Sequence, residues 1–182
     1  MQRYLLATVL ALLVGLSLAA PSIADEDEIF EFKRLDTIKI SLGQAIEIAE
    51  RDSKGKAVKA EFDIEHDHAL WEIKIFSGVA LREYEIDTES GQIAKVEDER
   101  VEQRLYSTVM AARFKGIEAA KTSAIEAVTV AEQQTAAKAI FLEVEREYGR
   151  AGQFEYEIIL RSEDKRLWVR IDAATGHIVS MQ

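Results

Sequence analysis

An internal repeat constrains this chain more than any other feature of its sequence. The segment IDTESGQI at residues 86–93 recurs as IDAATGHI at residues 171–178, 85 positions later. The same offset places Glu72-Ile73 on Glu157-Ile158, with no gap between these pairs and the glycine turns. Self-similarity at a fixed spacing predicts two copies of one structural unit.

The first 24 residues have the pattern of a secretory signal peptide. Arg3 supplies a positive end, residues 4–20 carry no charge, and Ser22 and Ala24 place small side chains where a signal peptidase cleaves. We expect cleavage after Ala24, which places the mature protein in the periplasm or outside the cell. The alternative is an uncleaved anchor, because about 17 apolar residues is the lower limit for spanning a bilayer.

The net charge and the absence of cysteine limit the kinds of function and stabilisation that this chain can have. The chain has 33 acidic and 23 basic residues, with a formal net charge of -10, and its Lys and Arg residues are scattered. Such a chain repels phosphate backbones, which argues against nucleic-acid binding. It has no cysteine, so core packing must stabilise an exported fold in place of disulfides.

Residues 25–40 are expected to form an acidic N-terminal arm. They open with four acidic residues, and the apolar residues at 29–32 and 38–40 predict either a leading strand or a lead-in segment. The acidic run lacks the alternating ligand spacing and the glycine of a calcium loop. We therefore expect a solvated tail.

Two helices are predicted by matching start signals. Ser41-Leu42-Gly43-Gln44 and Ser123-Ala124-Ile125-Glu126 both have the form of a capping box, in which the two end residues satisfy each other's free backbone N–H groups. The first helix is expected to end near Asp52, with Gly55 as its stop. Apolar residues at three- and four-residue spacing predict one buried stripe on each helix: Leu42, Ala45, Ile46 and Ala49, then Ala124, Ala127, Val128 and Ala131.

After each helix the apolar period falls to two, as strands require. A turn of the form Asp-x-x-[Ser/Thr]-Gly precedes the last strand of each copy; its Asp can accept backbone N–H groups and its Gly takes a positive φ. The alternating segments are 60–65, 71–75, 82–86 and 92–96, then 140–144, 154–160, 167–171 and 177–181. Residues 41–97 and 123–182 are thus two repeats, and residues 98–122, with few Gly, Pro or Ser, are predicted to form a connecting helix.

The Ser-capped helix, the alternating strands and the Asp-x-x-[Ser/Thr]-Gly turn resemble a PepSY domain, and the chain looks like a tandem pair of them. The resemblance implies an α+β fold with two repeats, each one helix packed on an antiparallel sheet of about four strands, joined by a helix. Because single modules of about 60 residues are marginally stable, we expect the two copies to pack together.

PepSY modules occur in the propeptides of thermolysin-like metalloproteases, where protease inhibition and folding assistance are their proposed roles, and in stand-alone exported bacterial proteins. The two-copy form is also similar to the β-lactamase inhibitory protein. The resemblance supplies no catalytic residues, because the family motif contains none, and no His-Glu-x-x-His of a metalloprotease occurs in the chain.

Candidate chemistry is sparse. His66 and His68 flank Asp67 and are weak candidates for metal ligands, since adjacent ligands in a hairpin turn need a third partner, and His177 is the only other histidine. There is no cysteine, and no serine in a Gly-x-Ser-x-Gly setting. We expect no cofactor, no resident metal and no enzymatic activity.

The repeats differ on their predicted outer faces. Alternation points Phe141, Ile159 and Trp168 outward in the second copy, where we align charged residues of the first copy: Glu61, Lys74 and Glu83. Leaving large apolar side chains exposed forfeits roughly 1.5–3 kcal/mol each. Either the connecting helix, through Leu105 and Val109, or the first repeat covers this patch, or another protein binds it with Trp168 as anchor.

These observations predict an exported, non-enzymatic PepSY protein that binds another protein and inhibits or chaperones a peptidase. Two alternatives stay open. The first is a structural or sensory accessory of an envelope complex. The second is a small-molecule or metal carrier, for which His66 and His68 would have to bind an ion. The partner and the oligomeric state are open as well.

Overall fold

The protein is described by a computed structural model that covers residues 33–78, 80–98, 113–146, 153–163 and 165–182. The expected signal peptide and the acidic run of the arm lie outside the described residues. The first repeat consists of α2 (Leu42–Ser53), β1 (Lys56–Glu65), β2 (His68–Phe76), β3 (Leu81–Asp87) and β4 (Ile93–Asp98). The second consists of α4 (Ala124–Thr135), β5 (Lys138–Arg146), β6 (Phe154–Ser162), β7 (Lys165–Asp172) and β8 (Ile178–Met181). Each repeat is a helix followed by four antiparallel strands, as predicted.

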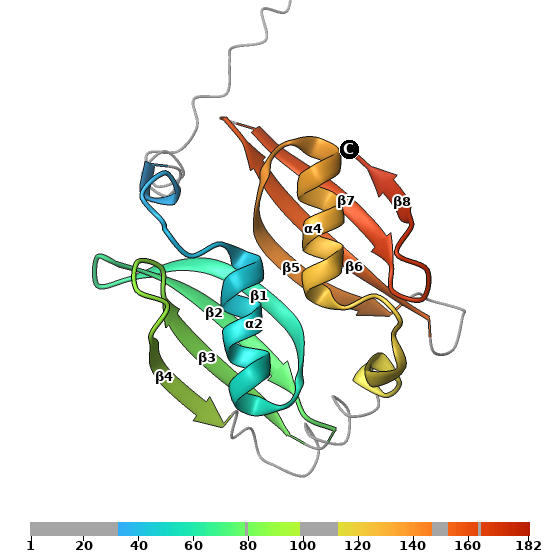
Figure 1. Cartoon of the computed structure of the whole chain (residues 1–182), viewed down its shortest axis with the longest axis horizontal. Helices are drawn as coiled ribbons and strands as arrows, with labels where there is room; N and C mark the ends of the chain where they lie inside the picture. Colours follow the sequence, from blue (N-terminus) through green and yellow to red (C-terminus); the bar gives the residue numbers. More distant parts are fainter. Residues whose placement is uncertain (1–32, 79, 99–112, 147–152, 164) are drawn as a thin grey trace, which may run out of the picture.

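The eight strands form one sheet in the order β4-β3-β2-β1-β5-β6-β7-β8. Both helices lie on the same side of this sheet, in front of it in Figure 1, and they contact each other. The apolar positions of the strands face the helices and build one core, whose largest fully buried side chains include Trp71, Tyr84 and Leu142. The opposite side of the sheet, which neither helix covers, is called the outer face below.

The two repeats join edge to edge through β1 and β5. Lys59 pairs with Glu143, Ala60 with Leu142 and Glu61 with Phe141. Ala60 stands as far after the cap Ser41 as Leu142 stands after the cap Ser123. Ala60 therefore pairs with its own equivalent in the other repeat. The two repeats are thus related by a local two-fold axis at this pair, as in an isologous contact.

Both helices begin where the capping boxes predict. Ser41 Oγ accepts the Gln44 N–H while Gln44 Oε1 accepts the Ser41 N–H, and Ser123 and Glu126 repeat this pattern. The expected stop at Gly55 was one residue late: Lys54, with φ 60°, caps α2 and donates its N–H to the Glu50 carbonyl. Gly55 is needed for space instead, because a Cβ there would lie 2.5 Å from Ile75 Cγ2.

The two hairpin turns that define the repeat have matching hydrogen bonds. Asp87 Oδ1 accepts the Ser90 N–H at 2.7 Å, and Asp172 Oδ1 accepts the Thr175 N–H at 2.8 Å. The Ser90 and Thr175 hydroxyl groups also donate to these carboxylates, and these bonds first, then the backbone N–H groups, hold the pKa of both aspartates below the usual range. Gly91 and Gly176 each adopt a φ of 72°, which is the positive φ that the turn predicted.

The described part of the lead-in segment, residues 33–40, contains no strand. Residues 33–35 are helical, and the Lys39 and Ile40 N–H groups both donate to the Thr88 carbonyl at 3.0 Å in the β3–β4 turn. Leu35 is buried in the core, and Asp36 forms an ion pair with Arg161 of β6 at 2.7 Å. This segment therefore contacts the second repeat as well as the first.

Most of the predicted connecting helix, including Leu105 and Val109, lies outside the described residues. Asp98 belongs to β4, residues 113–114 are helical, and a 3-10 turn η1 (Ile117–Ala119) follows Gly116, whose φ is 102°. The helix thus ends earlier than residue 122, because this glycine turns the chain toward α4. Phe114 is buried, with its ring 5.7 Å from that of Phe76.

Candidate interaction surface

Phe141, Ile159 and Trp168 lie side by side on the outer face, as the alternation predicted. Phe141 pairs with Ile159 across β5 and β6, and Ile159 pairs with Trp168 across β6 and β7. Adjacent strands are about 4.8 Å apart, so these side chains form a continuous apolar stripe. Phe141 and Ile159 are half-buried, whereas Trp168 is 42% exposed.

The first repeat does not cover this stripe. Its strands extend the same sheet sideways, so its outer face lies beside the stripe and not over it. That alternative for covering the patch is therefore wrong. The stripe is also narrower than a wholly apolar face, because charged residues flank it on the same strands: Glu143, Glu155, Glu157 and Arg170.

A hollow of about 540 Å³ opens beside Trp168 at the β8 edge. Its lining includes Arg170 and Glu157, which form an ion pair at 2.7 Å, and Gln182, whose backbone pairs with that of Trp168. The indole therefore forms one wall of a depression whose other wall is polar. Such a depression can receive a side chain from a partner.

One of the three charged residues that were aligned with the apolar stripe, Glu61, is not the structural equivalent of Phe141. A register shift after Ala57 in β1 is matched by one after Ala139 in β5, so Lys59 is the equivalent of Phe141, and Glu61 is not. Lys59 lies opposite Lys74, and Lys74 lies opposite Glu83. The alternation of apolar and polar residues in the sequence does not reveal the bulge, so this equivalence could not be predicted from it.

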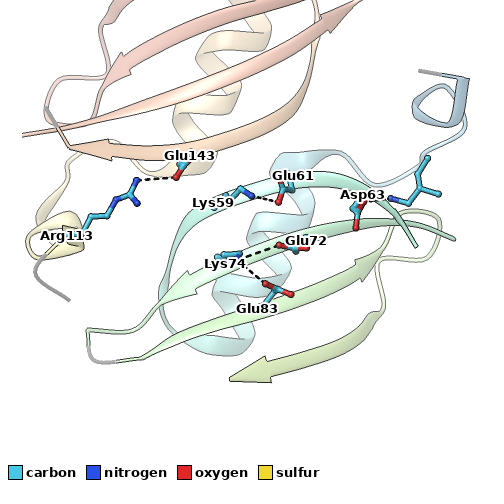
Figure 2. A network of polar contacts seen from close by, with 9 residues as sticks. Lys59, Glu61, Asp63, Glu72, Lys74, Glu83, Arg113 and Glu143 are labelled. Carbon is cyan, nitrogen blue, oxygen red and sulfur yellow. Dashed lines mark hydrogen bonds and ion pairs between the residues drawn. The ribbon is translucent and has the colours of Figure 1, made fainter. Parts of the chain in front are cut away.

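Figure 2 shows the polar network that these residues form. Lys74 Nζ lies 3.2 Å from Glu83 Oε2 and 3.9 Å from Glu72 Oε1, and Lys59 forms an ion pair with Glu61. Arg113 reaches this face from the segment before α4 and lies 3.2 Å from Glu143. Lys59 on β1 and Lys74 on β2 therefore both form ion pairs with carboxylates of the same face.

The line of cross-strand pairs that forms the apolar stripe continues into the first repeat as a row of three glutamates. Phe141 is paired with Glu61, Glu61 with Glu72, and Glu72 with Glu85. Like charges directly opposite each other on a sheet are destabilising. One line across six adjacent strands is thus acidic over its first half and apolar over its second half.

Glu72, at the centre of the acidic half, has an unusual pKa. Burial, and then the neighbouring carboxylates of Glu83 and Glu61, raise the pKa of Glu72 to about 7, although Lys74 and Lys59 act in the opposite direction. Its side chain is only 24% exposed. The free protein therefore keeps a carboxyl group on the outer face that is half-ionised near neutral pH.

We expect Glu72→Gln to stabilise the protein more at high pH than at low pH. The folded-state pKa of Glu72 lies above the usual value of 4.5, so the stability that its protonated form contributes is complete below the unfolded-state pKa and is lost as the pH rises through about 7. Gln imitates the neutral form. The melting temperature of Glu72→Gln should match that of the native protein at about pH 4 and exceed it at about pH 8.

The exposed Glu89 in the β3–β4 turn offers a matched control, since Glu89→Gln makes the same charge change. It should leave the difference between the two pH values unchanged. A lower melting temperature for Glu72→Gln at high pH would mean that the Lys74 contact outweighs the repulsion.

The weak metal candidates lie at a hairpin tip. His66 and Asp67 form the β1–β2 turn with positive φ values of 48° and 67°, and His68 begins β2. His177 is in the β7–β8 turn of the other repeat. Among the described residues, no group of three or more His, Cys, Asp or Glu side chains is placed to hold a metal ion.

The described part of the chain contains no helix that is long and apolar enough to cross a membrane.

The match to a family model agrees with the two-repeat organisation. Residues 39–97 and 123–182 each match the family model PepSY, described as peptidase propeptide and YPEB domain. The crystal structure of a candidate lipoprotein from Clostridium difficile is similar over 80% of this chain and 93% of that chain, with 12% sequence identity and a TM-score of 0.45. No curated protein matches the chain. Since the two matched segments span more than half of the sequence, the chain belongs to the PepSY family and carries two copies of its domain.

Proposed function

We propose that this is an exported, non-enzymatic protein that binds a peptidase through the outer face of its sheet and thereby inhibits it or assists its folding. The family description names peptidase propeptides, which supports a peptidase as the partner. The uncharged stretch of residues 4–20 and the small residues before the acidic run support export.

The observation that carries the proposal is the exposed Trp168 within the apolar stripe. Large aromatic side chains that are exposed beside a depression are typical anchors of protein interfaces. The helices α2 and α4 cover the other side of the sheet, so they leave the apolar stripe of Phe141, Ile159 and Trp168 uncovered. A preformed rigid sheet can present such a surface without reorganisation.

The test is an inhibition and refolding assay with peptidases purified from the envelope and secreted fractions of the native cell. The mature protein should inhibit at least one of them, or raise its refolding yield, and Trp168→Glu should lose that effect. Val96→Glu is the matched control, because Val96 is 46% exposed on β4 but pairs with Tyr84 on the helix side. If no peptidase responds and both variants instead copurify with one membrane complex, the protein is an accessory of that complex and the peptidase proposal fails.

A further inference from the structure

The outer face carries a charge pattern that specifies its partner more closely than an apolar stripe alone. Along one line of cross-strand pairs, Glu85, Glu72 and Glu61 lead directly to Phe141, followed by Ile159 and Trp168. The change from acidic to apolar falls at the β1–β5 join, which is the boundary between the repeats.

Among the described residues, the carboxylates of the acidic half outnumber the lysines that pair with them. From β1 and β3, Glu61, Glu83 and Glu85 face Glu72, while Lys59 and Lys74 are the facing cations. Lys74 is shared between Glu72 and Glu83, Lys59 pairs with Glu61, and Lys95 pairs with Glu85 at 2.9 Å. Among the described residues, the ion-pair partner of Glu72 is Lys74, at 3.9 Å, and Glu72 shares this lysine with Glu83.

We propose that the outer face binds a basic amphipathic segment of a partner protein, with its Lys or Arg side chains against the Glu85–Glu72–Glu61 row and its apolar side chains against Phe141, Ile159 and Trp168. This inference rests on the proposed function, because it names the chemistry of the partner at the same face. A cation placed over Glu72 relieves the repulsion among the three glutamates and ionises Glu72 fully. Apolar contact over the stripe then removes Trp168 from water.

The dimensions of the row set the length of the segment. From Glu85 on β3 to Trp168 on β7 there are five strand spacings of about 4.8 Å, which is about 24 Å. A helix covers that distance with about 16 residues, so roughly four helical turns with a cationic end and an apolar end on one side match the face.

The test uses two fluorescein-labelled helical peptides of about 16 residues. The first has lysines on one side of its first two turns and leucines on the same side of its last two turns; the second replaces the lysines with glutamates. Binding to the mature protein is measured by fluorescence anisotropy. We expect the lysine peptide to bind and the glutamate peptide to bind at least ~10-fold more weakly.

Variants identify the surface that binds. Glu61→Gln combined with Glu72→Gln should weaken binding of the lysine peptide by about 10-fold, and Trp168→Glu should abolish it. Glu89→Gln should have no effect. The affinity of the native protein should rise as the pH increases through about 7, where Glu72 ionises, and this rise should be absent in Glu72→Gln.

The result can be separated from that of the proposed function. Equal binding of both peptides, binding of neither, or an unchanged affinity in the double variant would overturn the basic-segment inference. If Trp168→Glu still eliminates peptidase inhibition while the glutamine variants inhibit normally, the peptidase proposal stands and only the charge pairing is wrong.

Discussion

Trp168→Glu is expected to weaken partner binding by at least ~30-fold while lowering the melting temperature by less than about 4 °C. Trp168 is 42% exposed on the outer face, so a large part of its apolar surface is still available for burial by a partner. A carboxylate at this position would place a negative charge in the apolar half of the outer face. It would also remove the apolar wall of the hollow beside Arg170. Binding is measured by titration calorimetry against the responding peptidase, and folding by circular dichroism.

The two measurements together distinguish a binding face from an internally covered one. Val96→Glu should keep both binding and stability, because it makes a similar change on the other side of the sheet at an exposed edge. If Trp168→Glu instead lowers the melting temperature by many degrees, the stripe is covered within the molecule and contributes to stability. In that case the proposed interface is wrong.

Trp71→Ala is expected to destabilise the fold by about 3–5 kcal/mol, which corresponds to roughly 10 °C in melting temperature for a protein of this size. Trp71 is fully buried, contacts Phe62 edge-on at 5.6 Å, and donates its indole N–H to the Ile40 carbonyl at 2.7 Å. Its removal leaves a large cavity and an unpaired carbonyl in the lead-in segment. The melting temperature is followed by circular dichroism.

The same variant tests whether the repeats unfold together. The chain has two tryptophans, so in Trp71→Ala the fluorescence comes from Trp168 in the second repeat alone. Because β1 and β5 join the two halves and α2 contacts α4, the Trp168 signal should shift by the same amount as circular dichroism. Trp168→Ala is the control and should shift the transition little. Two separate transitions would show that the repeats are independent.

Much of each repeat could be predicted because its signals are local. The capping boxes at Ser41 and Ser123 satisfy backbone groups within three residues, and the Asp87 and Asp172 turns do so within four. Alternation along each strand also identified Phe141, Ile159 and Trp168 as neighbours on one face. These outcomes depend on contacts between residues that are close in the sequence or on the period of a strand.

The errors have equally physical causes. A bulge changes which residue faces a given neighbour, so Lys59 and not Glu61 is the counterpart of Phe141. Lys54, and not Gly55, adopts the left-handed conformation that caps α2. Gly55 instead lies where a Cβ would clash with Ile75. Residues 38–40 were predicted to form either a leading strand or a lead-in segment, and the structure has the lead-in segment, because the Lys39 and Ile40 N–H groups donate to the Thr88 carbonyl.

By itself, the sequence determined the repeat, the helix starts, the glycine turns and the choice of which side chains face outward, since each depends on short-range backbone chemistry or on periodicity. Only the tertiary structure decided that β1 pairs with β5, because strand pairing between repeats leaves no local signal in either strand. That pairing merges two sheets into one and brings Glu61 of the first repeat against Phe141 of the second. The line of three glutamates and three apolar residues, on which the proposed recognition depends, exists only because of that join.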